Sequence, residues 1–165
     1  MQKTNTQKGF SLIELLIVVA IIGIIAAIAI PNLLASRRAA NEGSAQSSLR
    51  TINSAEATYQ STVGAGLFGT MLQMSGQSLV DPALAQATAV ATAKSGYVFG
   101  VNPTAASVVP AQYYATAVPS VTTGVGATGT RRFGISEDGV LHGDSTALTA
   151  YASEAVVQAA PFIGN

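Results

Sequence analysis

Cysteine is absent from this 165-residue chain, histidine occurs once, and charged residues make up only 10% of the sequence. The lack of cysteine excludes disulfide bonds, thiolate metal ligands and cysteine nucleophiles. A single histidine leaves no basis for a histidine-rich metal site. Eight basic residues balance eight acidic ones, so the chain lacks the net positive charge that would indicate a nucleic-acid site.

The apolar residues, 48% of the chain, are concentrated near its start. From Leu15 to Ile30 the sequence LLIVVAIIGIIAAIAI has no polar side chain. A helix over residues 10–30 would be about 31 Å long at about 1.5 Å per residue, which matches the bilayer core of about 30 Å. We therefore expect residues 10–30 to form a hydrophobic transmembrane helix.

Two ordinary kinds of segment share this pattern. In a secretory signal peptide, Lys3 and Lys8 would form the positive region and Ala27-Ile28-Ala29 the cleavage site. Cleavage there would leave Pro31 as the second mature residue. A plain single-pass anchor is the other alternative, although it gives Glu14 no role within the apolar block.

The residues from Lys8 to Ala26, KGFSLIELLIVVAIIGIIA, resemble the class III prepilin signal of type IV pilins and pseudopilins. A short basic leader, the Gly9–Phe10 pair and a single Glu occur together, and the resemblance continues through Ala29-Ile30-Pro31-Asn32. It implies that prepilin peptidase removes leader residues 1–9 by cutting after Gly9. It also implies that Phe10 is then N-methylated and that the apolar block stays with the mature chain.

The same resemblance gives Glu14 a role in subunit docking. In the family, this carboxylate is proposed to pair with the N-terminal amine of an adjacent subunit, here that of Phe10. Removing one partner of such a buried pair costs roughly 3–5 kcal/mol. The alternative is that Glu14 only complements the dipole at the helix N-terminus, an effect of about 0.3–1 kcal/mol.

Two residues weaken the apolar helix. An interior glycine such as Gly23 costs about 1 kcal/mol relative to alanine, and an interior proline such as Pro31 about 3 kcal/mol. We expect a kink or local melting between them. A melted segment is what the family resemblance implies, and a simple bend at the membrane exit is the alternative.

Beyond Pro31 the sequence predicts an amphipathic continuation of the helix over residues 31–61. Its apolar positions recur every three or four residues, at Ala45, Leu49, Ile52, Ala55 and Tyr59. This stripe needs a cover, and a small globular head over residues 62–165 supplies it. The expected fold class is α+β, with a long pilin-like N-terminal helix packed on a small antiparallel β-sheet.

Local signals predict the elements of the head. Asp81-Pro82 is typical of a helix start, with the helix ending near Lys94. Alternation and turn residues predict four strands, namely 97–101, 112–118, 131–136 and 140–142. The third and fourth form a hairpin around a turn at 137–139. Residues 145–160 fit either a helix or a strand.

Several sequence patterns resemble phosphate-binding, catalytic or calcium sites but do not meet the requirements of such sites. The glycine patterns at 64–69 and 124–129 lack the strand-glycine-helix context of a phosphate-binding loop, so we interpret both as flexible loops. Ser136, Asp138 and His142 lie in one hairpin, which does not favour a catalytic triad. Glu137, Asp138 and Asp144 match no calcium-ligand spacing, so we expect no cofactor, with calcium as the alternative. We expect that the protein is not an enzyme.

Together these features predict a structural subunit of a helical surface filament, a type IV pilin. The alternatives are a major pseudopilin of a type II secretion system and a single-pass membrane-anchored binding or adhesin module. The expected partners are identical subunits, prepilin peptidase and the pilus or secretion assembly machinery. The precursor is expected in the inner membrane, and the product in an extracellular or periplasmic filament.

Overall fold

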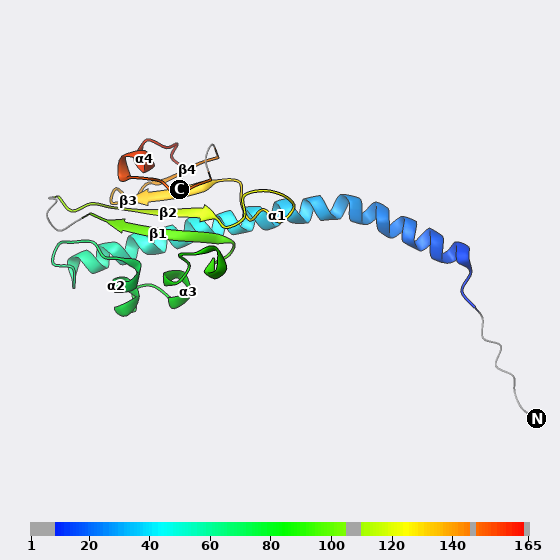
Figure 1. Ribbon diagram of the computed structural model, residues 1–165, viewed down its shortest axis with the longest axis horizontal. Helices are drawn as coiled ribbons and strands as arrows, with labels where there is room; N and C mark the ends of the chain where they lie inside the picture. Colours follow the sequence, from blue (N-terminus) through cyan, green and yellow to red (C-terminus); the bar gives the residue numbers. More distant parts are fainter. Residues whose placement is uncertain (1–8, 105–109, 146–147, 164–165) are drawn as a thin grey trace, which may run out of the picture. The chain divides into compact units, whose positions relative to one another are not determined.

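A computed structural model describes residues 9–104, 110–145 and 148–163 of the chain. It divides into two compact units, Met1–Ser36 and Arg37–Asn165. Helix α1 (Leu12–Ser61) contributes residues to both units (Figure 1). The expected leader, residues 1–9, lies outside the described residues except for Gly9.

The first unit consists, where described, of the N-terminal half of α1 and the residues just before it. The predicted long apolar helix is confirmed, and it begins at Leu12 rather than Phe10. In the described part of the chain, α1 is the one helix long and apolar enough to cross a membrane. The helix continues through Gly23 and Pro31. Because proline has no backbone N–H, the hydrogen bond from position 31 is missing inside the helix.

In the second unit, the C-terminal half of α1 buries the predicted stripe. Leu49 and Ile52 are fully buried, and Ala45, Ala55 and Tyr59 are at most 8% exposed. These residues pack with the inward side chains of the sheet into one hydrophobic core. The amphipathic pattern in the sequence therefore locates the face of α1 that the head covers.

The head contains a four-stranded antiparallel sheet in the order β1-β2-β3-β4. Its strands are β1 (Tyr97–Pro103), β2 (Tyr113–Pro119), β3 (Arg132–Ser136) and β4 (Leu141–Asp144). Phe99 pairs with Ala117, which pairs with Phe133, so these core side chains share the face turned toward α1. The predicted α+β class and all four strands are confirmed.

The opposite face of the sheet carries helix α4 (Glu154–Gln158) (Figure 1). Gly134 points to this face between Phe133 and Ile135, and a Cβ there would lie 2.9 Å from Val157 and 3.0 Å from Tyr151. Because glycine lacks a Cβ, α4 and Tyr151 can pack closely on the strand. The segment that fitted either a helix or a strand therefore contains a short helix.

Two predictions of local structure were wrong. The helix opening at Pro82 ends at Ala85, as α3 (Pro82–Ala85), and only a 3₁₀ turn, Val90–Thr92, follows before Lys94. The amide of Phe99 donates to the carbonyl of Ala87, which draws this segment onto the edge of β1 in place of further helix. Strand β1 also runs through Asn102 and Pro103, which an edge strand tolerates.

Helix α2 (Met71–Gly76) has no counterpart among the sequence predictions. Thr70 caps it, since its hydroxyl accepts from the amide of Gln73 while the Gln73 side chain accepts from the amide of Thr70. This reciprocal capping box stabilises a helix too short to be detected by periodicity. Met71 and Met74 bury its inner side.

Candidate functional site

The expected cleavage site lies just before α1. Gly9 and Phe10 are outside the helix, and the Phe10 side chain is 85% exposed. No atom lies within 4 Å of the position of a Cβ at Gly9. A non-helical, exposed peptide bond is what a peptidase requires, so this arrangement suits cleavage between Gly9 and Phe10, which stays a prediction.

Glu14 closes the first turn of α1. Its Oε2 accepts a hydrogen bond from the backbone amide of Ser11, at 3.0 Å. This contact satisfies one of the amides left free at a helix N-terminus, and the negative charge lies at the favourable end of the helix dipole. The contact engages only Oε2, which leaves Oε1 for the docking contact that the family resemblance implies.

None of the described residues covers the apolar half of α1. None of its large hydrophobic side chains from Phe10 to Leu33 is buried. The exposed ones are Phe10, Leu12, Ile13, Leu15, Leu16, Ile17, Val18, Val19, Ile21, Ile22, Ile24, Ile25, Ile28, Ile30 and Leu33. An apolar surface of this extent marks a membrane or protein contact. Small residues such as Ala20, Gly23 and Ala27 allow other helices to approach it closely.

The predicted kink or melting concerns the same segment. The helical structure passes through Gly23 and Pro31, and a Cβ at Gly23 would meet no atom within 4 Å. Gly23 is therefore not required for packing within this chain. Local melting between the two residues in a filament stays a prediction.

A polar cluster joins α1 to the segment between β2 and β3. Arg38 donates to the carbonyls of Gly124 and Ala127, and Asn41 donates to the carbonyl of Thr128. The glycine pattern at 124–129 is therefore a loop, as predicted, and hydrogen bonds from α1 hold it in place. The pattern at 64–69 is likewise a loop, between α1 and α2.

Glu42 completes this attachment from a buried position. It accepts hydrogen bonds from the amide and hydroxyl of Thr130 and from the guanidinium of Arg131. Burial alone would raise the pKa of Glu42, but these hydrogen bonds and the charge of Arg131 lower it overall. The helical pattern places Glu42 outside the predicted apolar stripe, so the sequence does not predict this structural role.

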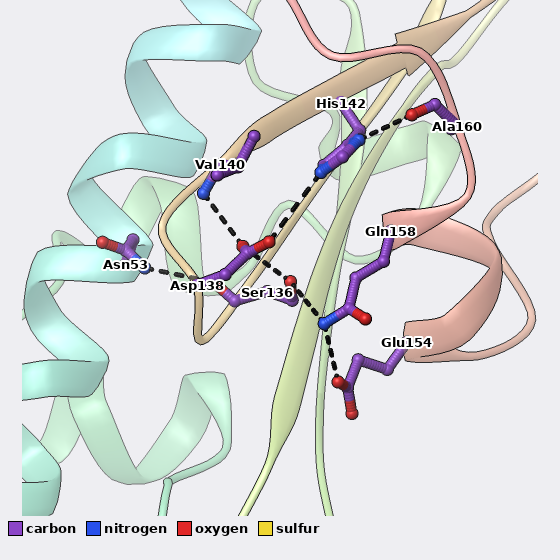
Figure 2. A network of polar contacts seen from close by, with 8 residues as sticks. All are labelled: Asn53, Ser136, Asp138, Val140, His142, Glu154, Gln158 and Ala160. Atoms are coloured by element: carbon purple, nitrogen blue, oxygen red, sulfur yellow. Dashed lines mark hydrogen bonds and ion pairs between the residues drawn. The ribbon is translucent and has the colours of Figure 1, made fainter.

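The β3–β4 turn brings together three residues that resembled a triad (Figure 2). Asp138 lies between the other two: its Oδ1 accepts from Ser136 Oγ at 2.8 Å, and its Oδ2 lies 3.9 Å from His142 Nε2. The serine hydroxyl therefore donates to a carboxylate and not to the imidazole, whereas a nucleophilic serine must contact its histidine base. The cluster stabilises a turn.

Metal chemistry finds no support in the described residues, where no group of three or more His, Cys, Asp or Glu side chains could hold an ion. Of the three acids considered for calcium, Asp144 forms an ion pair with Arg132 at 2.8 Å, and Asp138 accepts from Ser136 and Val140. Calcium binding stays an untested alternative. The described part of the chain also contains no detectable pocket.

Glu56 of α1 is a buried acid that was not predicted from the sequence. Its side chain is fully buried, with Oε2 accepting from the amide of Gly69 at 2.8 Å and Oε1 without a hydrogen-bond partner. Burial raises the pKa of Glu56 to about 7, although the hydrogen bond from Gly69 opposes this effect. Its spacing of four residues from Ile52 was the signal that places it on the buried face.

Comparison with known proteins identifies the N-terminal segment. Residues 4–30 match the prokaryotic N-terminal methylation motif. The chain is 71% identical over 35 residues to the type IV wide pilus major component PilA4 of Thermus thermophilus, covering 21% of this chain and 27% of that protein. It is 46% identical over 52 residues to the type IV major pilin protein PilA of Myxococcus xanthus, covering 32% and 24%.

A third relative comes from a secretion system. Type II secretion system core protein G of Escherichia coli is 33% identical over 60 residues, covering 36% of this chain and 41% of that protein. The matches thus span between 24% and 41% of the relatives' own lengths. No solved structure significantly matches the chain. The N-terminal segment of the chain is therefore similar to those of type IV pilins and of a type II secretion core protein.

Proposed function

We propose that this protein is the structural subunit of a type IV pilus, polymerised through its N-terminal helix. The observation that carries the proposal is the apolar half of α1, whose large side chains are all left uncovered by the rest of the chain. A single copy satisfies them in a bilayer, whereas many copies satisfy them by packing their helices together. The methylation motif over the same residues supports this use of the helix.

Assembly follows from chemistry at Phe10 and Glu14. Prepilin peptidase cuts between Gly9 and Phe10, and the new α-amino group keeps its positive charge when it is methylated. In the membrane, Glu14 lies in the first turn of α1 and reaches the headgroups. Among packed helices it cannot hydrate, so it pairs with the Phe10 ammonium of a neighbouring copy. This pairing fixes the axial register between subunits.

The head has a structural role in this proposal. Its sheet is attached to α1 by a buried core and by the contacts of Arg38, Asn41 and Glu42. The helix and head therefore move as one piece from Arg37 onward, which suits a unit that repeats along a filament. The precursor spans the inner membrane before assembly, and the partners are identical copies, the peptidase and the assembly machinery.

The N-terminus of the mature protein tests this proposal. Protein purified from membranes and from sheared filaments is analysed by N-terminal sequencing and intact mass. A chain that starts at methylated Phe10 and sediments as filaments is the expected result. A start at Ile30 would instead indicate a secreted protein, and an intact Met1 a plain membrane anchor such as that of an adhesin module; either would overturn the proposal.

A type II secretion pseudopilin is the second candidate, because the match to core protein G covers 60 residues and the larger share of the relative. The two candidates differ in the product. A pilin gives long surface filaments in electron micrographs at native expression, whereas deletion of a pseudopilin gene stops protein secretion without removing such filaments. Unfolding that becomes sensitive to a chelator would further favour the pseudopilin.

A further inference from the structure

The side of α1 opposite the head core has an unusual composition. We call it the outer face of α1: it consists of the exposed residues Gly43, Ser47, Arg50, Thr51, Ser54 and Thr58. Three of its hydroxyl groups donate back to the helix, from Thr51 to the carbonyl of Ser47, from Ser54 to that of Arg50, and from Thr58 to that of Ser54. Covering this face would therefore leave none of these three donors unpaired.

Arg50 is the one charged group on the outer face. Three other cations of the second unit form ion pairs: Arg131 with Glu42, Lys94 with Asp81, and Arg132 with Asp144. Arg38 donates to two backbone carbonyls. Among the described residues, Arg50 forms no ion pair. Arg37 also forms none, but it lies at the boundary with the apolar unit. If the outer face is covered, Arg50 is the group that requires an acidic partner.

Three acidic residues gather at one end of the sheet. Glu137 and Asp138 form the β3–β4 turn, and Glu154 begins α4 beside them. Partial burial and then the neighbouring Glu137 carboxyl raise the pKa of Glu154, with a further contribution from Asp138. Among the described residues no lysine or arginine forms an ion pair with any of the three. Like charges held together without a cation destabilise one another.

His142 lies beside Asp138 at this site (Figure 2). Its Nδ1 lies 2.7 Å from the carbonyl oxygen of Ala160, which can only accept, so Nδ1 carries a hydrogen. In the neutral ring Nε2 is then an acceptor. The side chain is only 9% exposed, and Nε2 has no hydrogen-bond partner although it points toward the Asp138 carboxylate. Asp138 is therefore engaged within the copy by Ser136, Val140 and His142, which leaves Glu137 and Glu154 as the outer acids of the cluster.

We propose that the carboxylates of Glu137 and Glu154 in one copy bind the guanidinium of Arg50 in a second copy of this chain. The inference rests on the filament function proposed above and adds a specific contact to it. A second copy is the partner because the chain has no net charge and carries both unpaired groups itself. Between the described residues of one copy, these groups form no ion pair with each other or with another side chain.

The chemistry of the two groups suits this contact. A guanidinium presents parallel N–H donors that fit carboxylate oxygens, and two adjacent carboxylates can be neutralised by one such fork. The small side chains beside Arg50, at Gly43 and Ser47, allow the partner to approach the helix. Complementary charges of this kind fix the register of an interface.

Disulfide cross-linking tests the contact directly, because the chain has no cysteine of its own. Arg50→Cys and Glu137→Cys are placed on two separately tagged full-length copies that are expressed together, so that only a bond between copies can form. Mild oxidation of the filaments is expected to give a mixed disulfide dimer. The matched control pairs Arg50→Cys with Asp81→Cys, an acid already bound to Lys94. A yield no higher than in this control overturns the proposal.

Charge reversal gives a second, independent measurement. Arg50→Glu or Glu137→Arg alone should lower the filament yield about tenfold, the factor that corresponds to 1.4 kcal/mol. The combined variant should recover most of the yield. Normal filaments from Arg50→Glu would overturn this contact and leave the filament function intact. Absence of filaments from the wild-type protein would instead overturn the filament function itself.

Discussion

The carboxylate of Glu42 in α1 binds the guanidinium of Arg131 through Oε2, which lies 2.9 Å from Nε and 2.8 Å from Nη2. Its Oε1 accepts from the amide and the hydroxyl of Thr130, each at 2.8 Å. Both oxygens are therefore occupied by one short segment at the start of β3. This contact joins positions 88 and 89 residues apart in the sequence.

Replacing Glu42 with alanine should destabilise the head by about 2–3 kcal/mol, because the Thr130 amide loses its partner and a charge-assisted bond is lost. The lowered pKa of Glu42 means that the folded state holds this proton less tightly than the unfolded state. Its contribution is therefore present above about pH 4.5 and is lost as the pH falls below it. Urea unfolding of the full chain in detergent, followed by tyrosine circular dichroism, measures both effects.

Asp81→Asn is the matched control for Glu42. Asp81 also binds a cation, Lys94 at 2.9 Å, but its side chain is half exposed. An exposed pair contributes about 0–1 kcal/mol, and the hydrogen bond to the Leu84 amide survives in asparagine. Equal destabilisation by both variants would contradict the role given to Glu42.

Glu56 predicts a pH dependence of the opposite sign. Its folded pKa of about 7 exceeds the ordinary value of 4.5, so the folded state holds the proton more tightly than the unfolded state. Its stabilising contribution is therefore complete below about pH 4.5 and is lost as the pH rises through 7. We expect the head to lose on the order of 2–3 kcal/mol of stability between pH 5 and pH 9.

Glu56→Gln separates this effect from other titrations. Glutamine is neutral at every pH and its Oε1 can still accept from the Gly69 amide. The variant should be more stable than the wild-type protein above pH 7, and its stability should change little between pH 6 and 9. Hydrogen exchange of the amides at 64–70, compared between the two proteins at equal pH, gives a local measurement. An unchanged pH profile would contradict the assignment to Glu56.

The sequence predicts this fold well where a single pattern decides the structure. The apolar run fixes the N-terminal half of α1, the spacing of Leu49, Ile52 and Tyr59 fixes its buried face, and the turn at 137–139 fixes the β3–β4 hairpin. Each of these signals is local and repeated over several residues. The class III signal around Gly9 is equally local, and it carries the resemblance to type IV pilins and pseudopilins.

What the sequence did not predict depends on contacts between distant segments. The helix from Pro82 is cut short because Ala87 bonds to Phe99 at the sheet edge. Glu42 and Glu56 are charged, as residues of a solvated helix face usually are, and their hydrogen-bond partners Thr130 and Gly69 come from other segments of the chain. Such contacts leave no periodic signal in one sequence.

Glu14 offers the most direct test of assembly. Glu14→Ala should leave cleavage after Gly9 unchanged, because the carboxylate lies beyond the scissile bond, and it should reduce filaments to a small fraction of the wild-type yield. The physical reason is that a buried ammonium on Phe10 would lack a partner, at a cost of roughly 3–5 kcal/mol. The processed fraction is measured by intact mass and the filaments by shearing and sedimentation.

Glu14→Gln distinguishes docking from helix capping. Glutamine can still accept from the Ser11 amide, as Glu14 does at 3.0 Å, but it cannot neutralise an ammonium group. Loss of filaments in this variant supports docking. Normal filament yield with glutamine would show that the hydrogen bond at the helix start is sufficient and would remove the docking role.

The backbone of Gly129 packs so closely against the Tyr97 side chain that there is no room for a Cβ atom. A Cβ at this position would lie 2.7 Å from Cζ of Tyr97 and would also clash with its hydroxyl. Tyr97 is fully buried, and its hydroxyl donates to the carbonyl of Arg131 at 2.8 Å. Gly129→Ala should therefore displace the ring or the loop and destabilise the head by about 1–3 kcal/mol.

Gly126→Ala, in the same loop, is the matched control for Gly129. A Cβ at Gly126 would meet no atom within 4 Å, and its backbone is not in the left-handed region. Alanine there should change stability by less than about 0.5 kcal/mol, as for other surface substitutions. Urea unfolding of both variants in detergent gives the comparison. If Gly129→Ala were as stable as Gly126→Ala, the packing of Tyr97 against this loop would not contribute to the stability of the head.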